Sequence, residues 1–167
     1  MGCEQLTELK KQVVSEFGSV DPAPASGITD LQYLQQRLND EELPMFQRMR
    51  AVFSLRNIRS DESALALCNG FSSSSALLRH EIAYVLGQMQ NPVVLDKLSE
   101  VLSDENEHVM VRHEAAEAMG AIGDLSIVPI LEEFKDHSLD EIAESCMVAL
   151  DLLDWVNSSE FEEYSTD

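Results

Sequence analysis

Hydrophobic residues recur along most of this chain at the spacing of amphipathic α-helices. In residues 79–89, Ile82, Val85, Leu86 and Met89 follow the i, i+3, i+4, i+7 pattern that gathers side chains on one helical face. No stretch of the sequence shows the sustained alternation of a β-strand, and helix-breaking residues fall between the periodic segments. The pattern therefore predicts an all-α protein.

The helical pattern is also repeated. The run Arg79–Met89 recurs as Arg112–Ile122, with His80 and His113 standing 33 residues apart, and weaker copies occupy Arg48–Leu55 and Ala143–Leu150. A period in this range indicates an α-solenoid of about four HEAT-like helical hairpins, in which each hairpin buries its apolar face against its neighbours. Each copy follows a shorter amphipathic segment, and these segments are Asp30–Leu38, Ala64–Phe71, Val94–Leu102 and Ile127–Phe134.

The repeats divide the chain into three parts. Residues 28–156 form the predicted HEAT-like repeat domain. Residues 1–27 comprise a weakly helical stretch and a proline-rich linker, which we expect to be extended because the residue before a proline disfavours the helical conformation. Residues 157–167 are predicted to form an acidic, flexible tail.

The charge balance narrows the choice of partners. The 167 residues include 11 Lys and Arg against 31 Asp and Glu, a formal net charge of −20. Nucleic acids and anionic membranes attract cationic surfaces, so neither is an expected partner. The balance favours a basic partner or a metal ion held by carboxylates.

The cysteines and the hydropathy of the chain indicate its cellular location. Cys3, Cys68 and Cys146 are far apart and odd in number, which is typical of reduced thiols in a cytoplasmic protein. No apolar run reaches the length that spans a membrane.

The two strongest repeats share a His-Glu pair. At about 100° per residue, His80 falls opposite the apolar stripe of its helix and Glu81 lies on the flank, and His113 and Glu114 take the same places one repeat later. Consecutive solenoid helices lie roughly 10 Å apart. We therefore expect both pairs at one height on one surface, which we take to be the concave one.

Two interpretations of these pairs remain open, a solvated polar face and a metal site. Helix packing requires shared apolar positions but not a shared His-Glu pair, which favours a metal site with His80, Glu81, His113 and Glu114 as ligands. Imidazole and carboxylate without sulfur suit non-haem iron or manganese better than structural zinc. The remaining histidines, His108 and His137, are interpreted as surface residues.

Two glycines lie on the same helical side as the histidines. Gly87 and Gly120 occupy equivalent positions inside the two helices, where glycine costs about 1 kcal/mol relative to alanine. Close approach of a ligand and tight helix–helix packing explain them equally well.

The runs around the two His-Glu pairs resemble the deoxyhypusine hydroxylase family. Residues 79–90, residues 110–123 and the shorter run Phe53–Asn57 carry the resemblance, which extends from about Ser19 to Trp155. It implies a HEAT-repeat, O₂-dependent monooxygenase with a non-haem di-iron (Fe²⁺) site. It also implies a substrate, the deoxyhypusine residue of a basic translation initiation factor, which the enzyme hydroxylates to hypusine.

The resemblance covers only the C-terminal half of such enzymes. Family members have two similar halves with two His-Glu pairs each, which hold two irons between them, so His80, Glu81, His113 and Glu114 correspond to half of that set. One hypothesis is that a homodimer, or a separate first-half chain, completes the site. The alternative is an inactive half-length form or a non-catalytic HEAT-repeat adaptor that binds a basic protein.

Overall fold

The computed structural model describes residues 20–159 and 161, and most of these residues are helical. The predicted N-terminal helical stretch at residues 4–17 lies outside the described part. Between residues 20 and 157 of the described part, eight α-helices follow one another: α2 (Leu31–Asn39), α3 (Met45–Ile58), α4 (Asp61–Cys68), α5 (Ala76–Met89), α6 (Leu95–Ser103), α7 (Val109–Ile122), α8 (Val128–Phe134) and α9 (Asp140–Val156). Short 3₁₀ turns at Asn69–Ser72, Pro92–Val94 and Leu125–Ile127 follow α4 and lead into α6 and α8.

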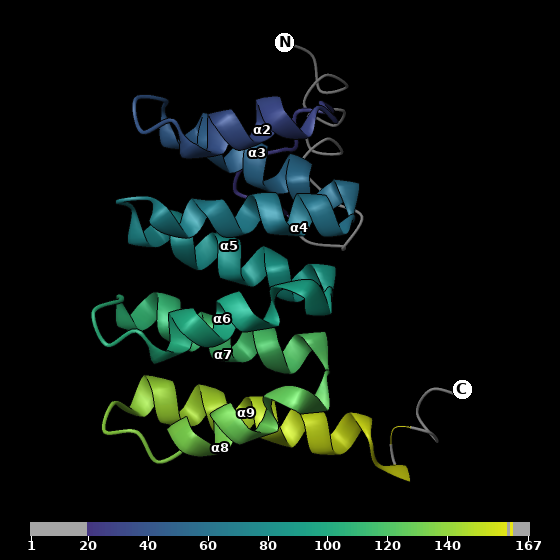
Figure 1. The fold of residues 1–167 in the computed structure, drawn as a ribbon, viewed down its shortest axis with the longest axis vertical. Coiled ribbons are helices and arrows are strands. Elements are labelled where there is room, and N and C mark those ends of the chain that lie inside the picture. The colour runs from purple at the N-terminus through teal and green to yellow at the C-terminus, as the bar shows by residue number, and fades with distance from the viewer. Residues whose placement is uncertain (1–19, 160, 162–167) are drawn as a thin grey trace, which may run out of the picture.

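The helices form four successive antiparallel pairs stacked along one axis, with α2 and α9 at opposite ends of the stack (Figure 1). Helices α3, α5, α7 and α9 pack in succession, and we call them the inner row. Helices α2, α4, α6 and α8 each pack against the inner-row helix that follows in the chain. The predicted all-α solenoid of about four HEAT-like hairpins is confirmed.

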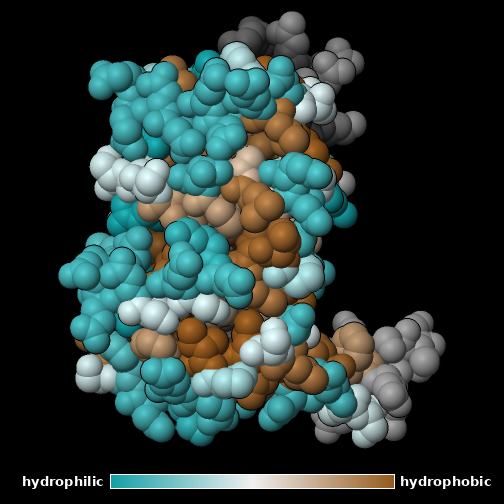
Figure 2. Space-filling model, viewed as in Figure 1, coloured by the Kyte–Doolittle hydropathy of each residue, from teal (hydrophilic) through white to brown (hydrophobic). Residues whose placement is uncertain are grey.

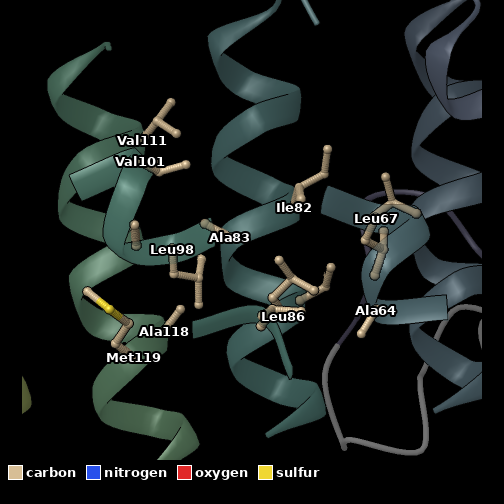
Figure 3. Close-up of a cluster of buried hydrophobic side chains, with 14 of the residues drawn as sticks. Ala64, Leu67, Ile82, Ala83, Leu86, Leu98, Val101, Val111, Ala118 and Met119 are labelled. Atoms are coloured by element: carbon tan, nitrogen blue, oxygen red, sulfur yellow. The ribbon is translucent and has the colours of Figure 1, made fainter. Parts of the chain in front are cut away.

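The predicted apolar stripes form the core. Ile82, Val85 and Leu86 of α5 have no exposed surface. Figure 3 shows Ile82 and Leu86 among side chains from α4, α6 and α7. Ala83 and Ala116, which are outside the predicted stripes, are also fully buried. An inner-row helix therefore buries more than one face, because it contacts two neighbours in its own row as well as the outer helices.

Charged residues at the start of the repeat motif are buried too. Arg48 Nε donates to the carbonyl of Leu38 at 2.9 Å, and Arg112 Nε donates to the carbonyl of Leu102 at 2.8 Å. Each bond joins an inner-row helix to the end of the helix before it, where a carbonyl lacks an intrahelical partner. The repeated arginine is thus a structural part of the hairpin, which the sequence pattern did not reveal.

The proline-rich segment packs against α3. Asp21 is buried beside Arg56, whose Nη1 and Nη2 donate to its two carboxylate oxygens at 3.0 and 2.8 Å. Ala23 is 1% exposed, and the Ser26 backbone N–H donates to Ser54 Oγ at 2.8 Å. This part of the predicted linker is therefore held by contacts with the first repeat, while the proposed domain boundary at residue 27 stays a prediction.

The predicted tail is described only at residues 157–159 and 161. There, the Phe161 ring meets the Trp155 ring edge-on, with 5.1 Å between centroids.

Hydrophilic residues cover much of the molecular surface on the face shown in Figure 2, and hydrophobic side chains are exposed between them at several heights of the stack. Among residues 20–159 and 161, no helix combines the length and the hydropathy needed to cross a membrane.

Candidate metal centre

Small residues bring the inner-row helices unusually close together. A Cβ placed on Gly87 of α5 would lie 3.0 Å from the Ala118 Cα of α7, and one on Gly120 of α7 would lie 2.8 Å from the Ala149 Cα of α9. These distances are shorter than ordinary van der Waals contact. Of the two explanations for the glycines, the structure therefore supports tight helix–helix packing.

The close approach brings together side chains from the two His-Glu pairs. His80, His113 and Glu114 each offer one ligand atom, and these atoms lie within 4.8 Å of one another. The two imidazole rings are tilted, with centroids 5.8 Å apart. Both histidine side chains are about one quarter exposed, at 25% and 26%, whereas the Glu114 side chain is 11% exposed. We call these three residues the metal group.

One hydrogen bond joins the two helices within the metal group. His80 Nε2 lies 3.1 Å from Glu114 Oε2, and this bond raises the pKa of the His80 imidazole against the opposing effect of burial. The other ring nitrogen, His80 Nδ1, is buried and has no hydrogen-bond partner within the described part of the chain. An unpartnered buried nitrogen is costly, so this ring has unused capacity to coordinate or donate.

Glu81 stands apart from the other three predicted ligands. It is not among the residues whose ligand atoms converge, although the charges of His80 and Glu114 both act on it. Burial is the main cause that raises the pKa of Glu81, and the buried ion pair of Asp21 and Arg56 contributes opposing smaller effects. Its assignment as a ligand remains a prediction.

A residue from α9 supports the group from outside. Ser145 Oγ donates to Glu117 Oε1 at 2.8 Å, and the same oxygen lies 3.4 Å from His113 Nδ1. A carboxylate on one ring nitrogen of a histidine orients the ring and sets which nitrogen is free to bind a metal. The repeat pattern did not predict the role of Ser145, although Ser145 occupies the register of Glu114 in the last repeat.

The other two histidines serve the backbone. His108 is exposed and its Nδ1 accepts from the Met110 N–H at the start of α7. His137 Nδ1 accepts from the Leu139 N–H, and its ring stacks on Phe134. Neither belongs to the metal group.

The donor set fits a metal ion. Two imidazoles and one carboxylate converge from two rigid helices, and no sulfur belongs to the group. Nitrogen and oxygen donors of this kind are the ligands of non-haem iron. Three donors from one chain would leave coordination positions of a bound metal ion open.

Comparison with known proteins agrees with the repeat architecture. A family model of HEAT repeats matches residues 64–151, more than half of the chain. The chain belongs to the HEAT-repeat family. Its relatives include deoxyhypusine hydroxylases. The protein of Candida albicans is 45% identical over 169 residues, and that of Danio rerio is 48% identical over 146 residues.

The matches cover nearly all of this HEAT-repeat chain but only part of its relatives. They include 98% and 87% of this chain, against 53% and 48% of the Candida albicans and Danio rerio proteins. The solved structure of human deoxyhypusine hydroxylase in complex with glycerol is similar with a TM-score of 0.83 at 41% identity, over 90% of this chain and 54% of that one. The chain is a deoxyhypusine hydroxylase homologue that spans about half the length of the relatives it matches.

Proposed function

We propose that this chain supplies one half of the iron site of a deoxyhypusine hydroxylase. The assembled enzyme hydroxylates the deoxyhypusine residue of a translation initiation factor to hypusine in the cytoplasm. The convergence of His80, His113 and Glu114 from adjacent inner-row helices carries this proposal. Similarity to deoxyhypusine hydroxylases at about 45% identity supplies the reaction.

The ligand roles follow from the donor chemistry. His80 and His113 would hold iron through neutral imidazole nitrogens, and Glu114 would hold it through its carboxylate. Glu81 completes the proposed set if its side chain turns toward the group. Iron supplies the redox chemistry that a hydroxylation by O₂ requires, while Ser145 and Glu117 hold the ring of His113 in orientation.

A second set of donors, facing this one, would complete the site. The chain spans about half of its relatives, and its metal group is open to solvent on the histidine side. A second copy related by a two-fold axis would present the same donors in opposition, and a separate first-half chain would serve equally. The net charge of −20 suits a basic substrate protein.

The test is an anaerobic titration with Fe²⁺, combined with sedimentation velocity before and after loading. We expect about one iron per chain and an iron-dependent dimer, because each half-site contributes the ligands for one metal of a pair. The double variant His80→Ala/His113→Ala should lose iron, and the matched double variant His108→Ala/His137→Ala should keep it. A chain that binds no iron but captures a basic protein is an adaptor, and that result would overturn the proposal.

The same experiment also tests whether two copies of the chain form the site together. If the chain binds iron and remains a monomer, a second copy of the chain does not complete the site.

A further inference from the structure

A cavity of about 400 Å³ opens beside the metal group, between α5, α7 and α9. Glu114 belongs both to the metal group and to the cavity lining. The small residues Gly87, Ala118 and Ala149, which let the inner-row helices approach, also line it. The cavity is therefore a direct product of the packing that assembles the metal group.

Part of the cavity lining is aliphatic. Ala121 of α7 and Val148 and Leu152 of α9 line it, and the Val148 side chain leaves this apolar surface facing solvent, since the residue is 60% exposed. Apolar surface of this kind gains free energy when a hydrocarbon chain covers it.

The charges that line the cavity are all negative. Glu114 and Glu117 are its ionisable carboxylates, and the described lining includes no Lys, Arg or His. Ser145 Oγ donates a hydrogen bond to Glu117 Oε1 at 2.8 Å. Within α5, the Tyr84 hydroxyl accepts a hydrogen bond from Gln88 Nε2 at 3.1 Å. A fixed carboxylate next to an aliphatic wall is complementary to a cation on a hydrocarbon chain.

We propose that this cavity binds an aliphatic ammonium side chain, with its carbons against Val148 and Leu152 and its ammonium group on Glu117. The choice of ligand rests on the proposed function, because a deoxyhypusine side chain carries its amines on an aliphatic chain. Glu117 is then a substrate-positioning residue as well as a support for His113, and Ser145 fixes its carboxylate for both purposes.

A second cavity competes for the same cation. It measures about 300 Å³, shares Glu117 and Val148 with the first, and adds Glu141 and Glu144 of α9. Its apolar lining is limited to Val148. It offers a cation more carboxylates but gives a hydrocarbon chain much less to contact, so we assign the ammonium side chain to the larger cavity.

The experiment titrates the full chain with 1,4-diaminobutane and follows backbone amide signals by NMR, with 1,4-butanediol as an uncharged probe of equal length. We expect the diamine to bind with a Kd on the order of millimolar and to shift the signals of Gly87, Ala121 and Leu152. The diol should leave them unchanged at the same concentration.

Three variants locate the cation. Glu117→Gln should raise the Kd by about tenfold, because a charge-assisted hydrogen bond is lost. Ala121→Leu, which fills the larger cavity without changing its charge, should abolish the shifts. Glu144→Gln removes the same charge from the second cavity and should leave the Kd within about twofold. Equal effects of Glu117→Gln and Glu144→Gln, or full binding by Ala121→Leu, would overturn the assignment.

Fe²⁺ titration of the same proteins separates the two proposals. Ala121→Leu should bind iron like the unchanged chain. If iron binds normally and the diamine shifts nothing, the cavity assignment fails while the proposed function survives. If the diamine pattern holds and no iron binds, the proposed function fails and the cavity remains an ammonium site.

Discussion

Two pairs of inner-row helices share one packing scheme and differ in what they display. Helices α5 and α7 carry His-Glu at their second and third motif positions, whereas α3 carries Met49-Arg50 and α9 carries Glu144-Ser145. In the outer repeats these positions make structural contacts. Arg50 Nε donates to the carbonyl of Pro24 at 3.0 Å, and Ser145 supports Glu117.

The residues that hold the row of helices together differ from the residues that vary between repeats. Buried aliphatic residues, close glycine–alanine contacts and motif arginines that bond the preceding helix recur along the row and hold it together. The two positions that project beside them are free to vary between repeats. In the central pair they carry the side chains that converge in the metal group, while Arg50 of α3 bonds the N-terminal segment.

The largest expected effect is a loss of folding stability when a contact that holds the repeats together is removed. Asp21→Ala removes the carboxylate that pairs with the fully buried guanidinium of Arg56, and we expect a loss of about 3–5 kcal/mol in the free energy of unfolding. Urea denaturation measures it. Glu62→Ala, at an exposed site, should stay within about 0.5 kcal/mol of the unchanged chain. A similarly small loss for Asp21→Ala would show that the segment is not held by this ion pair.

The next largest effect concerns the metal donors. His113→Ala should weaken Fe²⁺ binding by about 100-fold, since loss of a supporting partner alone typically costs 10–100-fold. Glu144→Ala changes the same register position in the last repeat and should weaken it by no more than about threefold. Anaerobic equilibrium dialysis compares them. Equal losses would mean that α9 supplies a ligand and that the central pair is not distinct.

The two glycines test the packing that both regions share. Gly120→Ala places a Cβ 2.7 Å from the Ala149 Cβ, whereas Gly87→Ala places one 3.2 Å from the Ala118 Cβ. Overpacking costs about 1–3 kcal/mol and the gain in helix propensity is about 1 kcal/mol, so Gly120→Ala should lose about 1–2 kcal/mol and Gly87→Ala less. Thermal denaturation gives the order, and a more stable Gly120→Ala would contradict the close contact.

The smallest effect is a pH dependence of the metal-free chain. The pKa of His80 is raised by its hydrogen bond to Glu114, so this contact stabilises the fold fully below the ordinary histidine pKa and less as the pH rises through the raised value. With chelator present, the stability difference between the unchanged chain and His80→Gln should therefore shrink from about pH 6 to about pH 8. A difference that grows with pH would contradict the bond.

The candidate site was only partly predictable. Helical spacing placed both His-Glu pairs at one height, and the structure brings His80, His113 and Glu114 together. It separates Glu81 from them, although Glu81 and Glu114 hold identical positions in their repeats. The reason is that α5 and α7 have different neighbours, since the ion pair of Asp21 and Arg56 acts on Glu81 while Glu114 faces His80 of α5.

By itself, the sequence determined the repeat architecture, because the burial of apolar residues at a helical period leaves few alternatives to stacked hairpins. It also determined the kinship with deoxyhypusine hydroxylase over about half of that protein. The packing of the helices against one another selects which donors converge, brings Ser145 to Glu117 from the next repeat, and opens a cavity beside Glu114. These features depend on distances between helices, which the side chains at each contact set and which a periodic pattern within one helix does not encode.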